Sequence, residues 1–168
     1  IKIVRLTKNF GQTPAIQAGL RHCEGEGVII FSADLQAPYE KIIDMVRAWK
    51  RGSKFIIGER KERKETLFPQ TISKSTWKMF RNSGFKDFPS MGFDFCFLDR
   101  QIVSEINQIN EKNTSIFPLI FWLGYKPTFV DITRTLRSAG KSQWGWLKKF
   151  RITLDTLIAF THVPVRFI

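Results

Sequence analysis

The stretch Val28-Ile29-Ile30-Phe31-Ser32-Ala33-Asp34-Leu35-Gln36 decides the fold of this chain. Its first four residues form a short, fully apolar run, which is typical of a strand buried on both faces. Strands of this kind occur mainly in parallel sheets that helices cover on both sides. The polar residues follow the run directly, so we expect them at the carboxyl end of the strand, where open parallel sheets bind ligands.

The residues before this stretch predict a β-α-β unit. Residues 1–6 have the composition of a strand, and Thr13-Pro14 follows as a capping residue with proline at the first helical position. Gly25 and Gly27 end the helix. A strand, a helix and a second strand in this order predict parallel pairing.

The remainder of the chain continues the alternation of helices and strands, which predicts the α/β class. In order, the patterns predict a helix from Pro38 to Gly52, a strand at 54–57, a helix at 73–82, a strand at 93–98, a helix capped by Asp99, a helix at 115–123, a strand at 128–135 and an amphipathic helix at 144–160.

The charge predicts an acidic partner. The net charge is +12, and basic residues concentrate between Lys50 and Lys64 and again from Arg134 onward. Nucleic acid, anionic lipid headgroups and phosphorylated small molecules all fit such charge, as does a solvated basic face without a specific partner. No zinc-finger, helix-turn-helix or RNA-binding signature supports nucleic acid. Cys23, Cys96 and both histidines have the surroundings of structural residues.

The two ends predict that the chain is a piece of a longer protein. The first residues already have a strand pattern without an initiating Met, and the last residues, 163–168, end on apolar side chains. No apolar run reaches the roughly 18 residues that a transmembrane helix needs.

Asp34 and Gln36 form a candidate cation site. Residues two apart in extended backbone point to the same side, so both can present oxygen ligands together. Mg²⁺ or Mn²⁺ accepts such a pair when substrate phosphates and water complete the coordination. The alternative is that Asp34 only caps the helix that Pro38 opens.

Several sequence blocks resemble one family. They are Asn9-Phe10-Gly11-Gln12, Ala18-Gly19-Leu20, Ala33-Asp34-Leu35-Gln36-Ala37-Pro38-Tyr39-Glu40, Gly58-Glu59-Arg60-Lys61-Glu62-Arg63, Phe93-Asp94-Phe95-Cys96-Phe97-Leu98-Asp99-Arg100 and Arg137-Ser138-Ala139-Gly140-Lys141-Ser142. Their order and spacing are similar to those of the inverting family 2 glycosyltransferases that make polyprenyl-phosphate sugars. Ser32 and Ala37 depart from that pattern, because the family often has Asp at both positions.

The resemblance implies a GT-A-like, Rossmann-related, mostly parallel sheet flanked by helices and lacking the family's first β-α-β portion. It implies an N-terminally truncated catalytic domain at 1–143 and an amphipathic juxtamembrane helical segment at 144–168. That final helix combines tryptophan and leucine with Lys148, Lys149 and Arg151, as an interfacial membrane helix does. An ordinary core-packing helix is the alternative.

The resemblance also implies roles for individual residues. Asp94 is the base-like residue facing the acceptor; the alternative is a carboxylate paired with a structural arginine. Arg137, Lys141 and Ser142 would bind the donor diphosphate or the acceptor phosphate, as would Arg60 and Arg63. The donor-binding residues would be Asn9, Gly11 and Gln12.

The activity that the resemblance implies is hexose transfer from a UDP- or GDP-linked sugar to a polyprenyl phosphate lipid, with Mg²⁺ or Mn²⁺, at the cytoplasmic face of a membrane. Segments outside this chain would anchor the protein, which could form a homo-oligomer. The sequence does not specify which sugar is transferred. The alternative functions are transfer to a different acceptor, a non-catalytic basic binding module and an inactive relative of the family. A processive synthase is disfavoured because the chain has no Gln-x-x-Arg-Trp motif.

Overall fold

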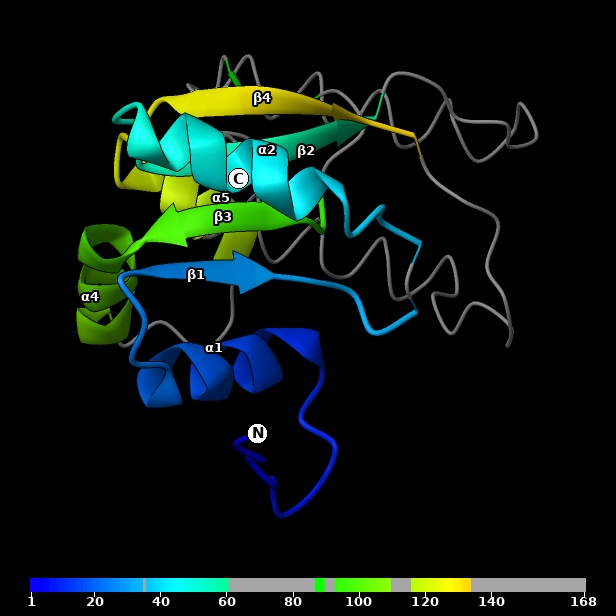
Figure 1. Ribbon diagram of the computed structural model, residues 1–168. Helices are drawn as coiled ribbons and strands as arrows, with labels where there is room; N and C mark the ends of the chain where they lie inside the picture. The colour runs from blue at the N-terminus through cyan, green and yellow to red at the C-terminus, as the bar shows by residue number, and fades with distance from the viewer. Residues whose placement is uncertain (35, 61–86, 90–92, 110–115, 134–168) are drawn as a thin grey trace, which may run out of the picture.

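The structure is a computed structural model that describes residues 1–34, 36–60, 87–89, 93–109 and 116–133 (Figure 1). In chain order its elements are α1 (Gln12–His22), β1 (Gly27–Ile30), α2 (Lys41–Lys50), β2 (Phe55–Arg60), β3 (Cys96–Asp99), α4 (Arg100–Gln108), α5 (Ile116–Trp122) and β4 (Pro127–Ile132). The α/β class is confirmed.

The strands form one four-stranded sheet in the order β1-β3-β2-β4. β3 runs antiparallel to both of its neighbours, β1 and β2, and the pair β2 and β4 is parallel. The sheet is therefore mixed: β1, β2 and β4 run in one direction and β3 runs against them. This arrangement, with helices beside the sheet, agrees with the expected GT-A-like α/β fold.

The expected β-α-β unit at the start of the chain is wrong. Residues 1–6 form no strand, and the apolar side chains of Ile1 and Ile3 are exposed. β1 instead pairs with β3, whose apolar residues offer a hydrogen-bonding edge of matching length. α1 begins at Gln12 after Gly11, whose φ of 95° only glycine adopts easily, so Thr13 lies inside the helix rather than at its cap.

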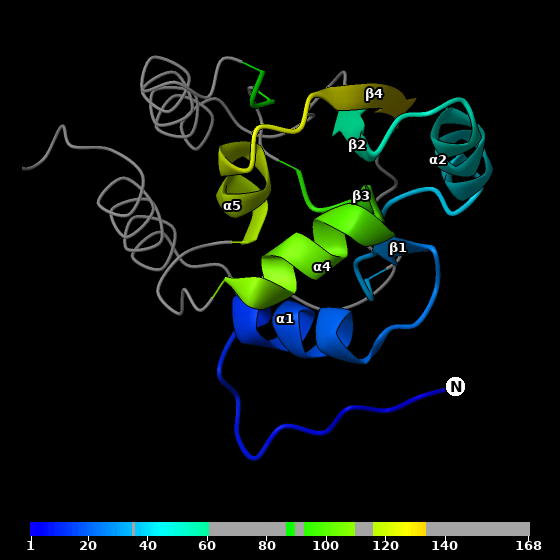
Figure 2. The ribbon, with the colours of Figure 1, turned by 90° about the vertical axis from the view of Figure 1, so that its left-hand side faces the viewer.

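Helices cover both faces of the sheet, as expected (Figure 2). α2 packs on one face, where Met45 and Ala48 meet Ile56, Phe95 and Phe97. On the opposite face α1, α4 and α5 cover the sheet. Buried residues of these helices and of the strands form one cluster there, which includes Leu20, Ile102, Val103, Ile106, Ile116, Ile120, Phe55, Ile57, Cys96 and Leu98. The sheet is therefore the middle layer of three. Because helices cover both of its faces, a binding site is expected where the strands end.

Two helix starts illustrate how local sequence sets the elements. The predicted cap at Asp99 is confirmed, since its Oδ1 accepts from the backbone N–H of Gln101 at 2.9 Å. The predicted start at Pro38 is three residues early. Its carbonyl accepts from Lys41 N at 3.1 Å, so Pro38 opens a tight turn that leads into α2.

The predicted helices at 73–82 and 144–160, and the boundary at 143, lie outside the described residues. Within the part of the chain that the structure describes, no helix has the length and apolar character needed to cross a bilayer.

Candidate active site at one edge of the sheet

Four strand ends meet at one edge of the sheet. β1 ends with Ile30 beside Cys96, the first residue of β3, and Ile57 of β2 lies on the other side of Cys96. β2 and β4 end side by side, with Arg60 opposite Ile132. The carboxyl ends of β1, β2 and β4 and the start of β3 therefore share this edge, and α/β sheets bind ligands at the carboxyl ends of their strands (Figure 1).

Asp34 lies in a turn directly beyond β1. Its Oδ1 accepts from the backbone N–H of Gln36 at 3.3 Å, which closes a local turn of the kind that Asp favours. Asp34 does not cap α2, because the cap position is Glu40 and no side chain caps that helix. Ala37 anchors the far end of the turn, 7% exposed among the residues that pack under α2. Asp34 and Gln36 themselves are half-buried.

The Asp94 segment lies against the first part of the same turn. The rings of Phe31 and Phe95 meet edge to face, with centroids 5.3 Å apart. Gly58 N donates to Phe95 O at 2.9 Å, which continues the pairing of β2 with the segment before β3. Half-buried Asp94 directly precedes Phe95. The structure therefore brings the Asp34 and Asp94 segments to one edge, with the end of β2 beside them.

The Asp94 carboxylate also acts on the neighbouring core. Burial raises the pKa of the Cys96 thiol well above its usual range, and the negative charge of Asp94 raises it further. Cys96 is fully buried, so it stays a neutral core residue at physiological pH.

The predicted donor-binding residues lie at the start of α1. Gly11 N donates to Asn9 Oδ1 at 2.9 Å, and both Asn9 and Gln12 are exposed. α1 runs back along β1, so its first turn is on the same side of the molecule as the end of β1 (Figure 1). These residues thus flank the edge that Asp34 and Asp94 share.

The predicted phosphate-binding residues are described only in part. Arg60 is the last residue of β2, opposite Ile132 of β4. Arg63, Arg137, Lys141 and Ser142 lie outside the described residues.

Sequence reasoning missed two further acidic residues at this edge. Glu59 and Asp131 occupy paired positions on β2 and β4, so their side chains leave the same face of the sheet near its end. Glu59 is half-buried and Asp131 is exposed. Both lay inside predicted blocks or strands, but only the register places them side by side.

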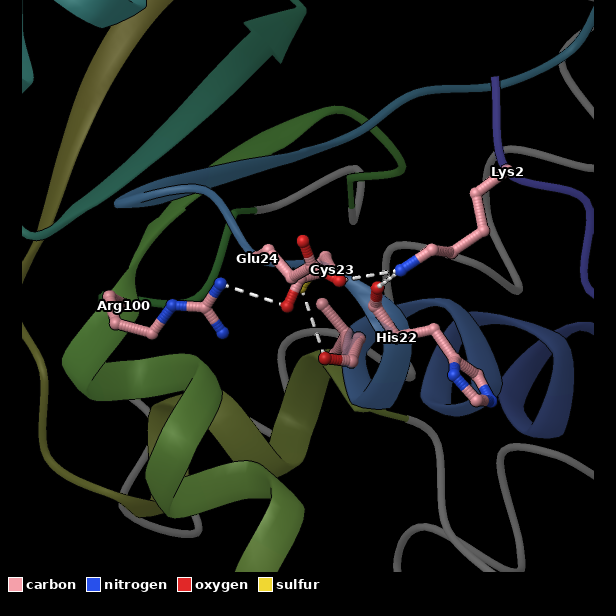
Figure 3. A network of polar contacts seen from close by, with 6 residues as sticks. Lys2, His22, Cys23, Glu24 and Arg100 are labelled. Atoms are coloured by element: carbon pink, nitrogen blue, oxygen red, sulfur yellow. Dashed lines mark hydrogen bonds and ion pairs between the residues drawn. The ribbon is translucent and has the colours of Figure 1, made fainter.

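Arg100, which belongs to one of the quoted blocks, serves the opposite end of β1. Its guanidinium donates to the carbonyls of Cys23, at 2.9 Å, and Gly25, at 2.8 Å. These two carbonyls belong to the connection between α1 and β1. Lys2 contacts the same connection from the other side, where its Nζ donates to Glu24 Oε1 at 2.7 Å and to the carbonyl of His22 (Figure 3). Arg100 therefore fixes the link between α1 and β1.

The donor set at the edge suits a cation shared with substrate. Carboxylate and amide oxygens are hard ligands of the kind that Mg²⁺ and Mn²⁺ prefer, and Asp34 and Gln36 supply one of each within a single turn. Among the residues that the structure describes, no three His, Cys, Asp or Glu side chains gather so as to hold a metal. Asp34 and Gln36 thus fit a cation that phosphate oxygens help to coordinate.

Comparison with known proteins identifies the family. YkcC, an uncharacterized glycosyltransferase of Bacillus subtilis, is 31% identical over 167 residues, which cover 99% of this chain and 52% of the relative. An uncharacterized glycosyltransferase of Synechocystis is 35% identical over 168 residues, with coverage of 99% and 52%. The bactoprenol glucosyl transferase of Shigella phage SfX is 28% identical over 161 residues, 95% of this chain and 53% of the relative.

The chain therefore spans about half the length of the curated relatives it matches. Residues 1–106, more than half of the chain, match the protein family described as glycosyl transferase family 2. The chain belongs to glycosyl transferase family 2.

Proposed function

We propose that the protein transfers a hexose, with inversion, from a nucleotide-diphospho-sugar to a polyprenyl phosphate lipid. We place this reaction at the cytoplasmic face of a membrane, in the synthesis of cell-envelope polysaccharide or glycolipid. Transfer of a sugar follows from the family, and the lipid acceptor is supported by relatives named bactoprenol glucosyl transferase, 27% to 28% identical to this chain.

One observation carries the proposal: the turn with Asp34 and the segment with Asp94 share one edge of the sheet, joined by the contact of Phe31 with Phe95 at 5.3 Å. A transferase needs a place for the donor diphosphate and, across from it, a group that faces the acceptor. These two segments offer one polar group to each partner.

In the proposed reaction an oxygen of the lipid phosphate attacks the anomeric carbon of the donor sugar. The bond from that carbon to the diphosphate breaks, and the nucleoside diphosphate leaves with the bonding electrons. A phosphate acceptor is already ionised near neutral pH, so Asp94 orients it rather than removing a proton. Arg137 and Lys141 would stabilise the charge on the leaving diphosphate, the arginine through a planar fork and the lysine as a mobile point charge.

Asp34 and Gln36 would hold Mg²⁺ or Mn²⁺ together with the donor phosphates. When bound, the cation supplies positive charge that neutralises the diphosphate. Asn9, Gly11 and Gln12 would contact the donor from the start of α1, and Arg60, Arg63 and Ser142 would contact a phosphate.

We further propose that residues 1–143 form the catalytic part and residues 144–168 an amphipathic segment on the membrane surface. The basic residues Lys148, Lys149 and Arg151 lie there beside tryptophan and leucine. Such a composition suits the interface of a bilayer with anionic lipids.

The direct test supplies the full-length protein with radiolabelled nucleotide sugars and polyprenyl phosphate, with and without Mn²⁺. We expect a lipid-extractable product that depends on the cation. Label that stays entirely in the aqueous phase for UDP- and GDP-linked hexoses alike would exclude the proposal.

Within this assay, Asp34→Ala and Asp94→Asn should each lower transfer by about 100-fold or more, since each removes a group that positions a substrate. Asp44→Asn is the matched control, because Asp44 lies on the surface of α2 and pairs with Lys41 at 3.0 Å. Its transfer rate should equal that of the wild type. Wild-type rates in either edge variant would remove that residue from the reaction.

A further inference from the structure

We propose that Phe95 is a positioning residue for this reaction: its ring fixes the turn that contains Asp34 relative to Asp94. This inference rests on the proposed function and deepens it. Phe95 has no polar side-chain group and is fully buried, so it acts only through the segments it holds.

Phe95 contacts the acidic turn through Phe31, the residue that connects β1 to it. The two ring planes are nearly perpendicular, at 89°, with centroids 5.3 Å apart. This edge-to-face geometry is the favourable one for aromatic pairs and resists rotation of either ring.

Gly58 leaves space for the Phe95 ring on the side of the ring away from Phe31. A Cβ at position 58 would lie 2.6 Å from Cδ1 of Phe95 and 3.2 Å from Cδ1 of Ile132. The Gly58 N–H also donates to the carbonyl of Phe95 at 2.9 Å. Phe95 is thus fixed by its backbone to β2 and by its ring to Phe31.

The two carboxylates lie a short distance along the chain from this contact. Asp94 is one residue from Phe95, and Asp34 is three residues from Phe31, so their Cα atoms lie within roughly 4 Å and 10 Å of those of the two phenylalanines. The far end of the turn is anchored in the same cluster, because Ala37 packs with Phe95 under α2. A shift of the Phe95 ring would therefore move both segments.

Phe97 offers a matched control two residues further along the chain. Phe95 directly precedes β3 and Phe97 lies within it; both belong to the same cluster, and Phe97 is 3% exposed. Phe97 packs against Trp49, with centroids 5.4 Å apart, and against Gly27 at the start of β1. It therefore lies toward the end of the sheet away from Asp34 and Asp94.

The test compares Phe95→Leu with Phe97→Leu in the full-length protein. Both changes remove a buried ring, so melting temperatures should fall comparably. For Phe95→Leu we expect kcat for hexose transfer to fall by about 10-fold to 100-fold, since small misplacements of reacting groups are costly. Phe97→Leu should keep kcat within about twofold of wild type, because the segments with Asp34 and Asp94 lie toward the other end of the sheet.

A second readout does not depend on turnover. Calorimetric titration with Mn²⁺ and a nucleoside diphosphate should give at least a fivefold weaker affinity for Phe95→Leu and an unchanged affinity for Phe97→Leu. If both variants lose kcat and affinity equally, Phe95 is only a core residue and the inference is overturned.

A double variant tests whether the position of the Phe95 ring, between Gly58 and Phe31, is what affects catalysis. Gly58→Ala should displace the Phe95 ring and lower kcat, and Gly58→Ala with Phe95→Leu should restore part of it, because leucine leaves room for the new methyl group. Strictly additive losses would contradict a shared effect through the ring.

The outcomes separate the two proposals. A wild-type protein that binds Mn²⁺ and the nucleoside diphosphate but transfers no hexose would defeat the proposed function, while the affinities of the leucine variants would still decide the role of Phe95. Normal transfer with indistinguishable leucine variants would defeat the role of Phe95 alone.

Discussion

Single residues at the sheet edge and in its core fulfil several roles at once. Both oxygens of Asp99 are used: Oδ1 caps α4 through Gln101 N at 2.9 Å, and Oδ2 accepts from Trp49 Nε1 at 2.7 Å. One side chain thus ties α2 on one face of the sheet to the start of α4 on the other. The cap was predictable from local sequence, whereas the partner 50 residues away was not.

Ala37 leads to a prediction about the acidic turn. The family often has Asp at this position, but here the side chain is 7% exposed among apolar residues. Ala37→Asp should therefore destabilise the protein by on the order of 3 kcal/mol, because it places a carboxylate among the apolar residues of this cluster. Urea denaturation at pH 7 measures the loss.

The same variant has a defined pH dependence. Burial raises the folded-state pKa of a carboxyl above its unfolded value of about 4, so the loss is full above the raised pKa and disappears as pH falls toward 4. Ala33→Asp is the control, because Ala33 lies exposed in the same turn. Its effect should stay within about 0.5 kcal/mol. Equal losses at both positions would show that the turn tolerates no charge, whatever its burial.

At the scale of elements, α4 is fastened to the connection between α5 and β4. The Tyr125 hydroxyl donates to Glu105 Oε1 at 2.7 Å, and Gln101 Nε2 donates to the same oxygen at 3.2 Å. Lys54, just before β2, donates to Gln101 Oε1 at 2.6 Å. This polar chain runs along the end of the sheet opposite the candidate site.

The phenol of Tyr125 gives this end of the sheet an alkaline limit. Burial, and then the hydrogen bond and charge of Glu105, raise the pKa of Tyr125 to about 12. The unfolded phenol ionises near pH 10, so the folded state keeps a proton that the unfolded state has lost. The stabilisation is therefore complete below about pH 10 and is lost as pH rises toward 12.

We expect Tyr125→Phe to cost about 1 kcal/mol at pH 7, the usual worth of one hydrogen bond, and to remove this alkaline loss. Denaturation midpoints between pH 7 and 11 for wild type and variant provide the measurement. Tyr39→Phe is the control, because Tyr39 is 67% exposed. Its denaturation midpoints should change with pH as those of the wild type do. A parallel decline in all three proteins would assign the alkaline loss to other groups.

At the scale of the whole molecule, two groups of basic residues have the same charge but different proposed roles. The net charge is +12, yet α2 and its C-cap present Arg47, Lys50 and Arg51 on an exposed surface that the proposed function does not use. The proposed membrane contact uses the equally basic residues Lys148, Lys149 and Arg151. The two triplets allow a comparison at equal net charge.

Changing Lys148, Lys149 and Arg151 together to Gln should weaken binding to vesicles with anionic lipid by about 100-fold at low salt, since each basic residue near such a surface contributes about 1 kcal/mol. Co-sedimentation measures this, and the binding should weaken with added salt. The same change at Arg47, Lys50 and Arg51 should have little effect. Equal losses from both triplets would indicate nonspecific attraction to net charge rather than contact by 144–168.

Much of the fold followed from local patterns. An apolar run located β1, and an alternating pattern at 93–98 located β3. Helical periodicity located α2, α4 and α5, and Asp99 marked a helix start, because each of these depends on residues close in sequence. The placement of Asp34 just beyond a buried strand also followed from sequence alone.

Strand direction and neighbourhood required the tertiary structure. Residues 1–6 have a strand pattern but no strand, and β3 runs antiparallel between β1 and β2. Pairing depends on which edge is available in three dimensions, and a strand pattern contains no information about its partner. For the same reason only the register placed Glu59 beside Asp131, and only the packing of the two segments placed Phe95 against Phe31.

The sequence by itself thus determined the α/β class, the family-like blocks and the polar residues that follow the strands. The tertiary structure decided that Asp34 and Asp94 share one edge, that Ala37 belongs to the core and that Arg100 serves the opposite end. The physical reason is that hydrophobic pattern and capping act over a few residues, whereas a site is made where distant segments end side by side.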